Sequence, residues 1–340
     1  MPGLDGLRAL AVIAVVWHHS HPGYTALPVS LNGFLGVDVF FVLSGFLITT
    51  LLLNERRTTG RISLQNFYVR RSLRIFPLYY FVLAFLSIYF MVMSAGANAS
   101  AFFRELPWHA SYTSNWVPLE SMMAITWSLS TEEQFYLVWP PVLAWFGARS
   151  LLPLLAFLGV NQAVNFGMLD SALNSVGLPY AALSILQVTF TPILLGVLLA
   201  FGMKLAGFRR LFEQLPSWAS LVGAVVLLAL ANIPGDLRGW PRLLFHIATA
   251  CVVALVVLHP RSGLVRALEW RPLVYVGTVS YGVYLLHKLV LHVVNRGLGA
   301  TAVESPELLF AVAILGTVSV AALSFHYIEA PILGLKARFR

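Results

Sequence analysis

Cationic and titratable side chains in this sequence stand at helical spacings inside long apolar runs. Arg8 and His19 are eleven residues apart in the first run. Eleven steps of about 100° return to nearly the same helix face, about 16 Å further along the axis. That face therefore presents a permanent cation and, deeper, an imidazole suited to general-base chemistry. The alternative interpretation is a snorkelling Arg8 and an interfacial, hydrogen-bonded His19.

A second cationic cluster precedes the third apolar run. Arg71 and Arg74 stand at i and i+3 and therefore share a helix face. Guanidinium groups bind phosphate oxygens in a planar fork, which predicts an anion site here. Pro77 follows the cluster and is expected to bend the helix and open a cavity behind it. The alternative interpretation is that the arginines only anchor the helix at the membrane surface.

The fourth run begins with polar residues in a region that is otherwise apolar. Glu132 and Tyr136 are one helical turn apart, and Ser128 lies one turn before Glu132. Acidic residues also favour the amino end of a helix, so a position at a helix start would account for one of the two adjacent glutamates. Two adjacent glutamates, a glutamine and a tyrosine instead indicate the wall of a polar cavity.

Two further polar residues lie deep in apolar runs. Asp38 is expected to pair with a cation or a hydroxyl inside the bundle, in a structural rather than a catalytic role, while Ser44 and Gly45 permit close helix approach. His287 is expected to be a second deep imidazole. His246 is interpreted as interfacial.

These residues must be positioned by membrane helices, because the composition of the chain is that of a protein surrounded by lipid rather than by water. Of the 340 residues, 59% are hydrophobic and 11% are charged, whereas soluble domains carry about 25% charged residues. A helix crosses the bilayer with about 20 mainly apolar residues. Ten such helices are predicted, forming one all-α transmembrane domain over residues 1–340. Their predicted ranges are Leu7–Tyr24, Gly33–Leu53, Ile75–Ala95, Ile125–Phe146, Leu151–Leu169, Tyr180–Lys204, Trp218–Ile233, Trp240–Leu258, Leu273–Val294 and Leu308–Tyr327.

The distribution of basic residues predicts the orientation of these helices. With both termini in the cytoplasm, most arginines and lysines fall inside, and only Arg104, Arg238, Arg242 and Arg296 fall in outer loops. The positive-inside rule favours this orientation. It also explains the net charge of +8 without a nucleic-acid partner. No run of residues has the spacing of a metal site or of a phosphate-binding glycine loop.

Six sequence blocks together resemble acyltransferase family 3 of membrane proteins, over nearly the whole chain. The blocks are Leu4–Ala9 with Arg8-x10-His19, Gly36–Phe46, Arg71-x-x-Arg74 with Ile75–Pro77, Trp127–Tyr136, Ser280–His287 and Glu329-x-Pro331. One block alone would be weak support for the family, but six blocks in order are specific.

The resemblance implies transfer of an acyl group, usually acetyl, from cytoplasmic acyl-CoA to a hydroxyl of a sugar, glycolipid, polysaccharide or macrolide. Arg8, Arg71 and Arg74 would then hold the phosphates of CoA, and His19 would act as general base. Glu132 would orient the imidazole of His19 or receive its proton. The developing oxyanion would be stabilised by Tyr136 or Ser128, and a covalent acyl-enzyme remains an alternative.

The resemblance also implies a bacterial inner-membrane protein. The sequence ends soon after the last predicted helix, so an appended hydrolase-like domain is not expected. The acceptor is then acylated directly or by a separate extracytoplasmic partner protein. The rival interpretation is a transporter or flippase for a lipid-linked sugar or small solute, since buried histidines, glutamates and arginines also form proton relays. Transporters often contain inverted repeats, and the two halves of the sequence show no convincing repeat.

Overall fold

The computed structural model describes residues 1–20, 32–93, 96–176, 190–234, 237–299 and 305–336. Within these ranges every regular element is helical, so the all-α expectation is confirmed. The longer helices are α1 (Pro2–Ser20), α2 (Leu35–Thr59), α3 (Leu64–Met93), α4 (Ala97–Ala110), α5 (Trp127–Phe146), α6 (Leu151–Asn165), α9 (Thr191–Gly202), α11 (Ala219–Ala231), α12 (Trp240–Leu258), α15 (Ser280–Leu298) and α17 (Pro306–Ser324).

Shorter helices connect or extend these elements. They are α7 (Asp170–Val176), α10 (Ala206–Glu213), α13 (Gly263–Leu268), α14 (Arg271–Thr278) and α18 (Ala330–Gly334), with 3₁₀ turns at Ser114–Trp116, Met122–Thr126 and Gly147–Ser150 and a π-helical turn at Phe325–Glu329. Residues 177–189 lie outside the described residues, and so do the start of the predicted helix Tyr180–Lys204 and the end of Leu7–Tyr24.

Five described helical stretches are long and apolar enough to cross a membrane. They are Leu35–Thr59, Leu64–Met93, Met122–Asn165, Trp240–Leu258 and Pro306–Gly334. Two sharply bent pairs raise the number to seven if each pair counts as one span: α9 with α10, and α14 with α15. The chain is therefore a membrane protein with several spanning helices. The number ten and the side of the termini stay predictions.

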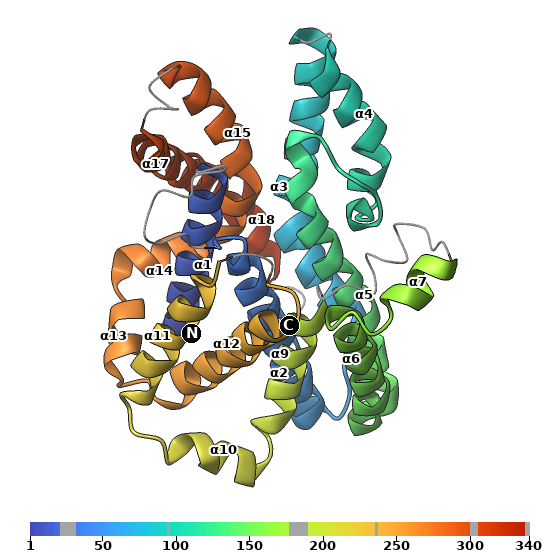
Figure 1. The fold of residues 1–340 in the computed structure, drawn as a ribbon, viewed down its shortest axis with the longest axis vertical. Coiled ribbons are helices and arrows are strands. Elements are labelled where there is room, and N and C mark those ends of the chain that lie inside the picture. The colour runs from blue at the N-terminus through green and yellow to red at the C-terminus, as the bar shows by residue number, and fades with distance from the viewer. Residues whose placement is uncertain (21–31, 94–95, 177–189, 235–236, 300–304, 337–340) are drawn as a thin grey trace.

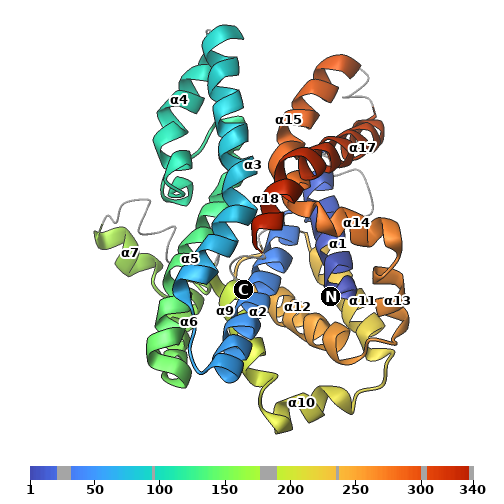
Figure 2. The same cartoon turned by 180° about the vertical axis from the view of Figure 1, so that it is seen from behind.

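The helices form two groups on either side of a central pair (Figures 1 and 2). Helices α2 and α9 pack against each other in the middle. Helices α3 to α6 lie on one side, and α1, α11 to α15 and α17 lie on the other. Helix α1 contacts α2, α14, α15 and α17, so its residues reach the centre of the bundle.

Large apolar side chains on the outside of the bundle are consistent with a lipid environment. On α3, Phe85 is 54% exposed, Ile88 63% and Met91 72%. The opposite face of this helix is buried, as at Leu78 and Tyr79. A helix that is apolar on both faces is solvated by protein on one side and by hydrocarbon on the other.

Glycines allow α2 and α9 to approach closely. A Cβ atom at Gly45 would collide with the carbonyl oxygen of Ile193, and one at Gly196 would collide with the carbonyl oxygen of Val42. Small residues at helix contacts are the usual means of packing helices in membranes, where lipid gives little hydrophobic driving force. The expectation that Gly45 permits close helix approach is confirmed.

The Gly196→Ala variant is expected to destabilise the protein by about 1–3 kcal/mol, because the added methyl group forces the two backbones apart. The measurement is the unfolding midpoint of purified protein in detergent. Gly159→Ala on α6 is the matched control, because no atom lies within 4 Å of the added methyl group. Equal midpoints for the two variants would contradict this role of Gly196.

One predicted helix is broken in the structure. The expected range Leu273–Val294 is divided between α14 and α15, which meet at 76°. Val279 at the break has φ −92° and ψ 7°, outside the helical region. A Cβ atom at Gly277 would collide with the backbone of Asp5, so α14 crosses α1 in close contact. The bend lets α14 follow α1 while α15 enters the bundle.

Candidate active site

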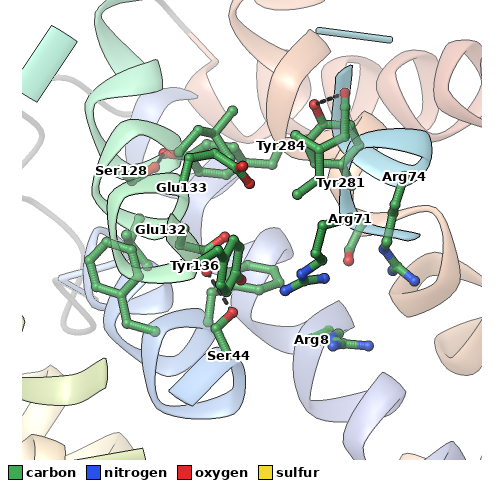
Figure 3. Close-up of a pocket in the computed structure, with 16 residues that line it drawn as sticks. Arg8, Ser44, Arg71, Arg74, Ser128, Glu132, Glu133, Tyr136, Tyr281 and Tyr284 are labelled. Carbon is green, nitrogen blue, oxygen red and sulfur yellow. Dashed lines mark hydrogen bonds between the residues drawn. The ribbon is translucent and has the colours of Figure 1, made fainter. Parts of the chain in front are cut away.

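A narrow cavity lies where α1, α2, α3, α5 and α15 meet (Figure 3). Its volume is about 90 Å³. It is lined by Arg8, Val37, Phe40, Phe41, Ser44, Arg71, Arg74, Ile75, Ser128, Leu129, Glu132, Glu133, Tyr136, Ser280, Tyr281 and Tyr284. This volume is well below the roughly 300–1,000 Å³ typical of sites that enclose a whole small-molecule ligand.

One side of the narrow cavity is cationic. Arg8 from α1 and Arg71 and Arg74 from α3 all line it, and their guanidinium groups lie near one another in Figure 3. Arg8 Nη1 donates to Asp5 Oδ1 at 3.1 Å, and the Arg71 guanidinium carbon lies 4.0 Å from the centre of the Tyr136 ring. The structure thus brings together the three arginines that the sequence singled out. Their converging positive charge favours an anionic ligand.

The facing wall comes from α2 and α5. Ser44 Oγ donates to Glu132 Oε1 at 2.6 Å, and Tyr136 lies one turn after Glu132. From the sequence, Glu132 was expected to orient the imidazole of His19 or to receive its proton. In the structure its hydrogen-bond partner is Ser44, so this contact supports neither role.

His19 pairs with the second imidazole, His287, between α1 and α15. His287 Nε2 lies 3.2 Å from His19 Nδ1, and the ring centres are 4.9 Å apart. His19 Nδ1 also lies 2.9 Å from the Val15 carbonyl oxygen, and His287 Nδ1 lies 2.5 Å from the Tyr284 carbonyl oxygen. The expectation of a second deep imidazole is fulfilled by His287, which is fully buried.

These contacts define the neutral tautomer of each ring. A carbonyl oxygen only accepts hydrogen bonds, so Nδ1 of His287 carries its proton and Nε2 of His287 is an acceptor. His19 Nδ1 therefore donates, shared between Val15 and His287. The remaining nitrogen, His19 Nε2, then holds the free lone pair that a general base needs.

The histidine pair lies behind the narrow cavity rather than in its wall. His19 and His287 are not among the lining residues. Tyr284 connects the two places: its side chain lines the cavity, its ring centre is 5.7 Å from that of His287, and its hydroxyl lies 2.6 Å from Ser128 Oγ. Helix α1 therefore carries Arg8 at the cationic side of the narrow cavity and His19 behind the wall that contains Ser128 and Tyr284.

Asp38 lies in a separate buried cluster between α2 and α12. Arg242 Nε donates to Asp38 Oδ2 at 3.2 Å, and His246 Nε2 lies 2.9 Å from the same oxygen. Asp38 is 1% exposed and His246 is fully buried. The expected pairing of Asp38 with a cation is confirmed. His246, interpreted from the sequence as interfacial, is buried inside the bundle against this aspartate.

Tyr281 and Tyr284 received no role from the sequence, whereas Glu133 was expected in the wall of a polar cavity. Glu133, Tyr281 and Tyr284 line the narrow cavity, and the Tyr281 hydroxyl donates to the Ile75 carbonyl oxygen at 2.8 Å. All three stand inside the sequence blocks that carry the family resemblance. The available signal was their position: Glu133 is adjacent to Glu132, Tyr284 lies one turn before His287, and Tyr281 lies nearly two turns before it. In the described part of the chain, no group of three histidine, cysteine or acidic residues is placed to hold a metal ion.

Comparison with known proteins gives a consistent family. Residues 1–326 match the family model described as an acyltransferase domain. Peptidoglycan O-acetyltransferase OatA of Listeria monocytogenes is 31% identical, covering 98% of this chain and 56% of that relative. O-acetyltransferase OatA of Staphylococcus aureus is 30% identical, covering 98% and 57%, and putative peptidoglycan O-acetyltransferase YrhL of Bacillus subtilis is 30% identical, covering 98% and 55%. The chain spans a little over half the length of these relatives. No solved structure matches it significantly.

Proposed function

Because the chain belongs to acyltransferase family 3, we propose that it is a membrane O-acyltransferase that moves an acetyl group from acyl-CoA to a hydroxyl of a carbohydrate acceptor. The observation that carries this proposal is the narrow cavity, which has three arginines on one side and the His19–His287 pair behind its hydroxyl-lined wall. The relatives are named for O-acetylation of peptidoglycan, which supports a cell-envelope polysaccharide as the acceptor.

Acyl-CoA is the proposed donor because three arginines line the cavity and phosphates are the anionic part of this molecule. Arg8, Arg71 and Arg74 supply three permanent cations for its phosphates. The small cavity volume leaves the nucleotide at the mouth and admits only the thin acyl-bearing arm. In this arrangement the thioester reaches the wall formed by Ser128 and Tyr284.

His19 is the proposed general base. The acceptor hydroxyl gives its proton to His19 Nε2 while its oxygen bonds to the thioester carbonyl carbon. The carbon–sulfur bond then breaks with its electron pair on sulfur, and the imidazolium proton neutralises the leaving thiolate. His287 accepts from His19 Nδ1–H and so holds the base in the required tautomer. Ser128 and Tyr136 are proposed to stabilise the oxyanion, whereas Asp38 is assigned a structural role.

We place this single domain in the inner membrane of a bacterium, with ten spans and both termini in the cytoplasm. The positive-inside distribution supports this orientation, and it puts the arginine side of the narrow cavity toward the cytoplasmic donor. A separate extracytoplasmic partner is proposed for cases where the final acceptor is too distant from the membrane.

The function is tested with purified protein in liposomes that have no ion gradient, supplied with acetyl-CoA and a carbohydrate acceptor. Release of free CoA together with an acetylated sugar, detected by mass spectrometry, is the expected result. Movement of the sugar across the bilayer without acetylation would instead establish the transporter or flippase.

The Arg74→Ala variant is expected to raise the apparent KM for acetyl-CoA about tenfold or more, with little change in kcat. The reason is the loss of a charge-assisted hydrogen bond to a phosphate. Arg70→Ala is the matched control, because Arg70 lies on the same helix outside the cavity lining and pairs with Glu55 at 3.6 Å. An unchanged KM in Arg74→Ala would mean that the cluster only anchors the helix.

A further inference from the structure

Helix α10 lies across the end of α9 instead of continuing it. The two helices meet at 99°. In Figures 1 and 2, α10 runs across the lower end of the bundle, at the same end as the last residues of α2. Its eight residues rise only about 12 Å, far less than the roughly 30 Å of hydrocarbon that a spanning helix crosses. Helix α10 is therefore too short to cross the bilayer by itself.

The bend between α9 and α10 is held by packing. The Phe208 ring folds back on α9, where a Cβ atom at Gly202 would lie 2.9 Å from its Cε1 atom. Phe212 is buried, and its ring centre lies 5.1 Å from that of Phe208. His259, which follows α12, has its Nε2 atom 2.9 Å from the Phe212 carbonyl oxygen. These contacts give α10 a defined orientation against the bundle.

Apolar and charged residues occupy different faces of α10. At about 100° per residue, the apolar side chains fall within one arc of the helix and the charged side chains within the opposite arc. The apolar arc holds Phe208, Leu211 and Phe212, and the charged arc holds Arg209, Arg210 and Glu213. A short helix divided in this way is suited to the boundary between an apolar and an aqueous phase.

Only part of this apolar side is used for packing within the protein. Leu211 is 61% exposed, Leu205 just before α10 is 64% exposed, and Trp218 after it is 62% exposed. In water these side chains would carry a free-energy cost proportional to their apolar area. At the surface of a bilayer the lipid covers them, and tryptophan is enriched at that depth.

The charged side of α10 has a net positive charge. Arg209 Nε donates to Glu213 Oε1 at 2.6 Å, so the net charge comes from Arg210 and from Lys204 at the bend. Both side chains are exposed. The Lys204 ammonium also lies close enough to Arg57, near the end of α2, for the two charges to repel. Anionic headgroups would relieve this repulsion, because basic residues beside a membrane surface attract anionic lipids.

We propose that residues 204–218, with α10 at their centre, form an interfacial anchor whose partner is the anionic headgroup layer of the bilayer. Leu205, Leu211 and Trp218 enter the edge of the hydrocarbon, while Lys204 and Arg210 contact lipid phosphates. This inference goes beyond the proposed acyltransferase function and does not depend on it.

Spin labels in liposomes test the placement of α10. In a Cys251→Ala background, Leu211→Cys and Arg210→Cys place labels on the two faces of the helix. Leu315→Cys, at an exposed apolar position on α17, is the lipid reference, and Arg261→Cys, in the exposed turn after α12, is the aqueous reference. The label at Leu211→Cys is expected to be relaxed mainly by oxygen, and the label at Arg210→Cys mainly by a water-soluble nickel chelate.

The other patterns of access would each overturn this placement. Oxygen access at both positions would make α10 the second half of a broken span, and nickel access at both would leave it in water. Low access of both reagents to Leu211→Cys, rising as the protein is diluted with lipid, would place a second copy of the chain on this face.

Fluorescence quenching tests the preference for anionic headgroups. Bimane attached at Leu211→Cys is compared in phosphatidylcholine liposomes that contain a small fraction of either brominated phosphatidylglycerol or brominated phosphatidylcholine. Phosphatidylglycerol is expected to quench more strongly there, and the two lipids are expected to quench equally at the Leu315→Cys reference. Adding Arg210→Gln is expected to lower the local enrichment of phosphatidylglycerol about fivefold.

Arg296→Gln is the matched control, because it removes an exposed arginine near the end of α15. It is expected to leave the enrichment at Leu211→Cys unchanged. Equal quenching by the two lipids at Leu211→Cys, or an Arg210→Gln variant with unchanged enrichment, would overturn the assignment of an anionic partner. Neither measurement uses acyl transfer, so a failure of this proposal is distinct from a failure of the proposed function.

Discussion

The His19→Ala variant is expected to lose acyl transfer by roughly 100-fold or more, because general-base catalysis by a positioned imidazole contributes about that factor. The substitution removes Nε2, the nitrogen that the contacts to Val15 and His287 leave with a free lone pair. The measurement is the initial rate of acetylated-sugar formation at saturating acetyl-CoA. Donor binding should not change, because His19 does not line the narrow cavity.

His18→Ala is the matched control for this variant. His18 is the preceding residue on α1, is exposed, and contacts the rings of His19 and Phe34 from the side. It is expected to keep near-normal activity. A pH profile adds a second criterion: the wild-type rate should fall as His19 becomes protonated, and the residual rate of His19→Ala should not show that titration. Near-normal product from His19→Ala would reject the base assignment.

The Asp38→Ala variant is expected to lower the free energy of unfolding by on the order of 3 kcal/mol. Removal of the carboxylate leaves the Arg242 guanidinium and the buried His246 without the acceptor that both contact. A buried charge without its partner costs more than the original pair contributed. The measurement is the unfolding midpoint in detergent, together with the fraction of monodisperse protein after size-exclusion chromatography.

Asp170→Ala is the matched control, because it also removes an aspartate from an arginine pair. Hydrogen bonds from Arg238 hold the pKa of the Asp170 carboxyl below its usual range. Both side chains of this pair are 44% exposed, so water replaces the lost contact and little stability is lost. If Asp38→Ala keeps its midpoint but loses activity, then Asp38 belongs to the reaction machinery and its structural assignment is wrong.

The family was predictable from the sequence because six blocks in order resemble it, and the shared face of its arginines was predictable because it depends only on local spacing. Arg71 and Arg74 share a face at any i, i+3 spacing on a helix, and the structure places both on one cavity. Asp38 was recognised as needing a cation because it stands within an apolar run. Its partner Arg242 was not predictable, because 204 residues separate the two in the chain and only the packing of α12 on α2 brings them together.

The limits of helix prediction have a similar cause. Leu273–Val294 has the length and hydropathy of one continuous span, and nothing local marks a break at Val279. The bend follows from the contact of Gly277 with the backbone of Asp5 on a distant helix.

The sequence by itself determined the all-helical membrane architecture and the charged side chains buried within it, because hydropathy and helical periodicity act over a few neighbouring residues. It also carried the six blocks that resemble the family. Tertiary structure decided which of those side chains meet. In the folded bundle Ser44 is the hydrogen-bond partner of Glu132, and His287 is the partner of His19. Such pairings depend on how far each helix is rotated and shifted against its neighbours, and that is fixed by packing across the whole bundle.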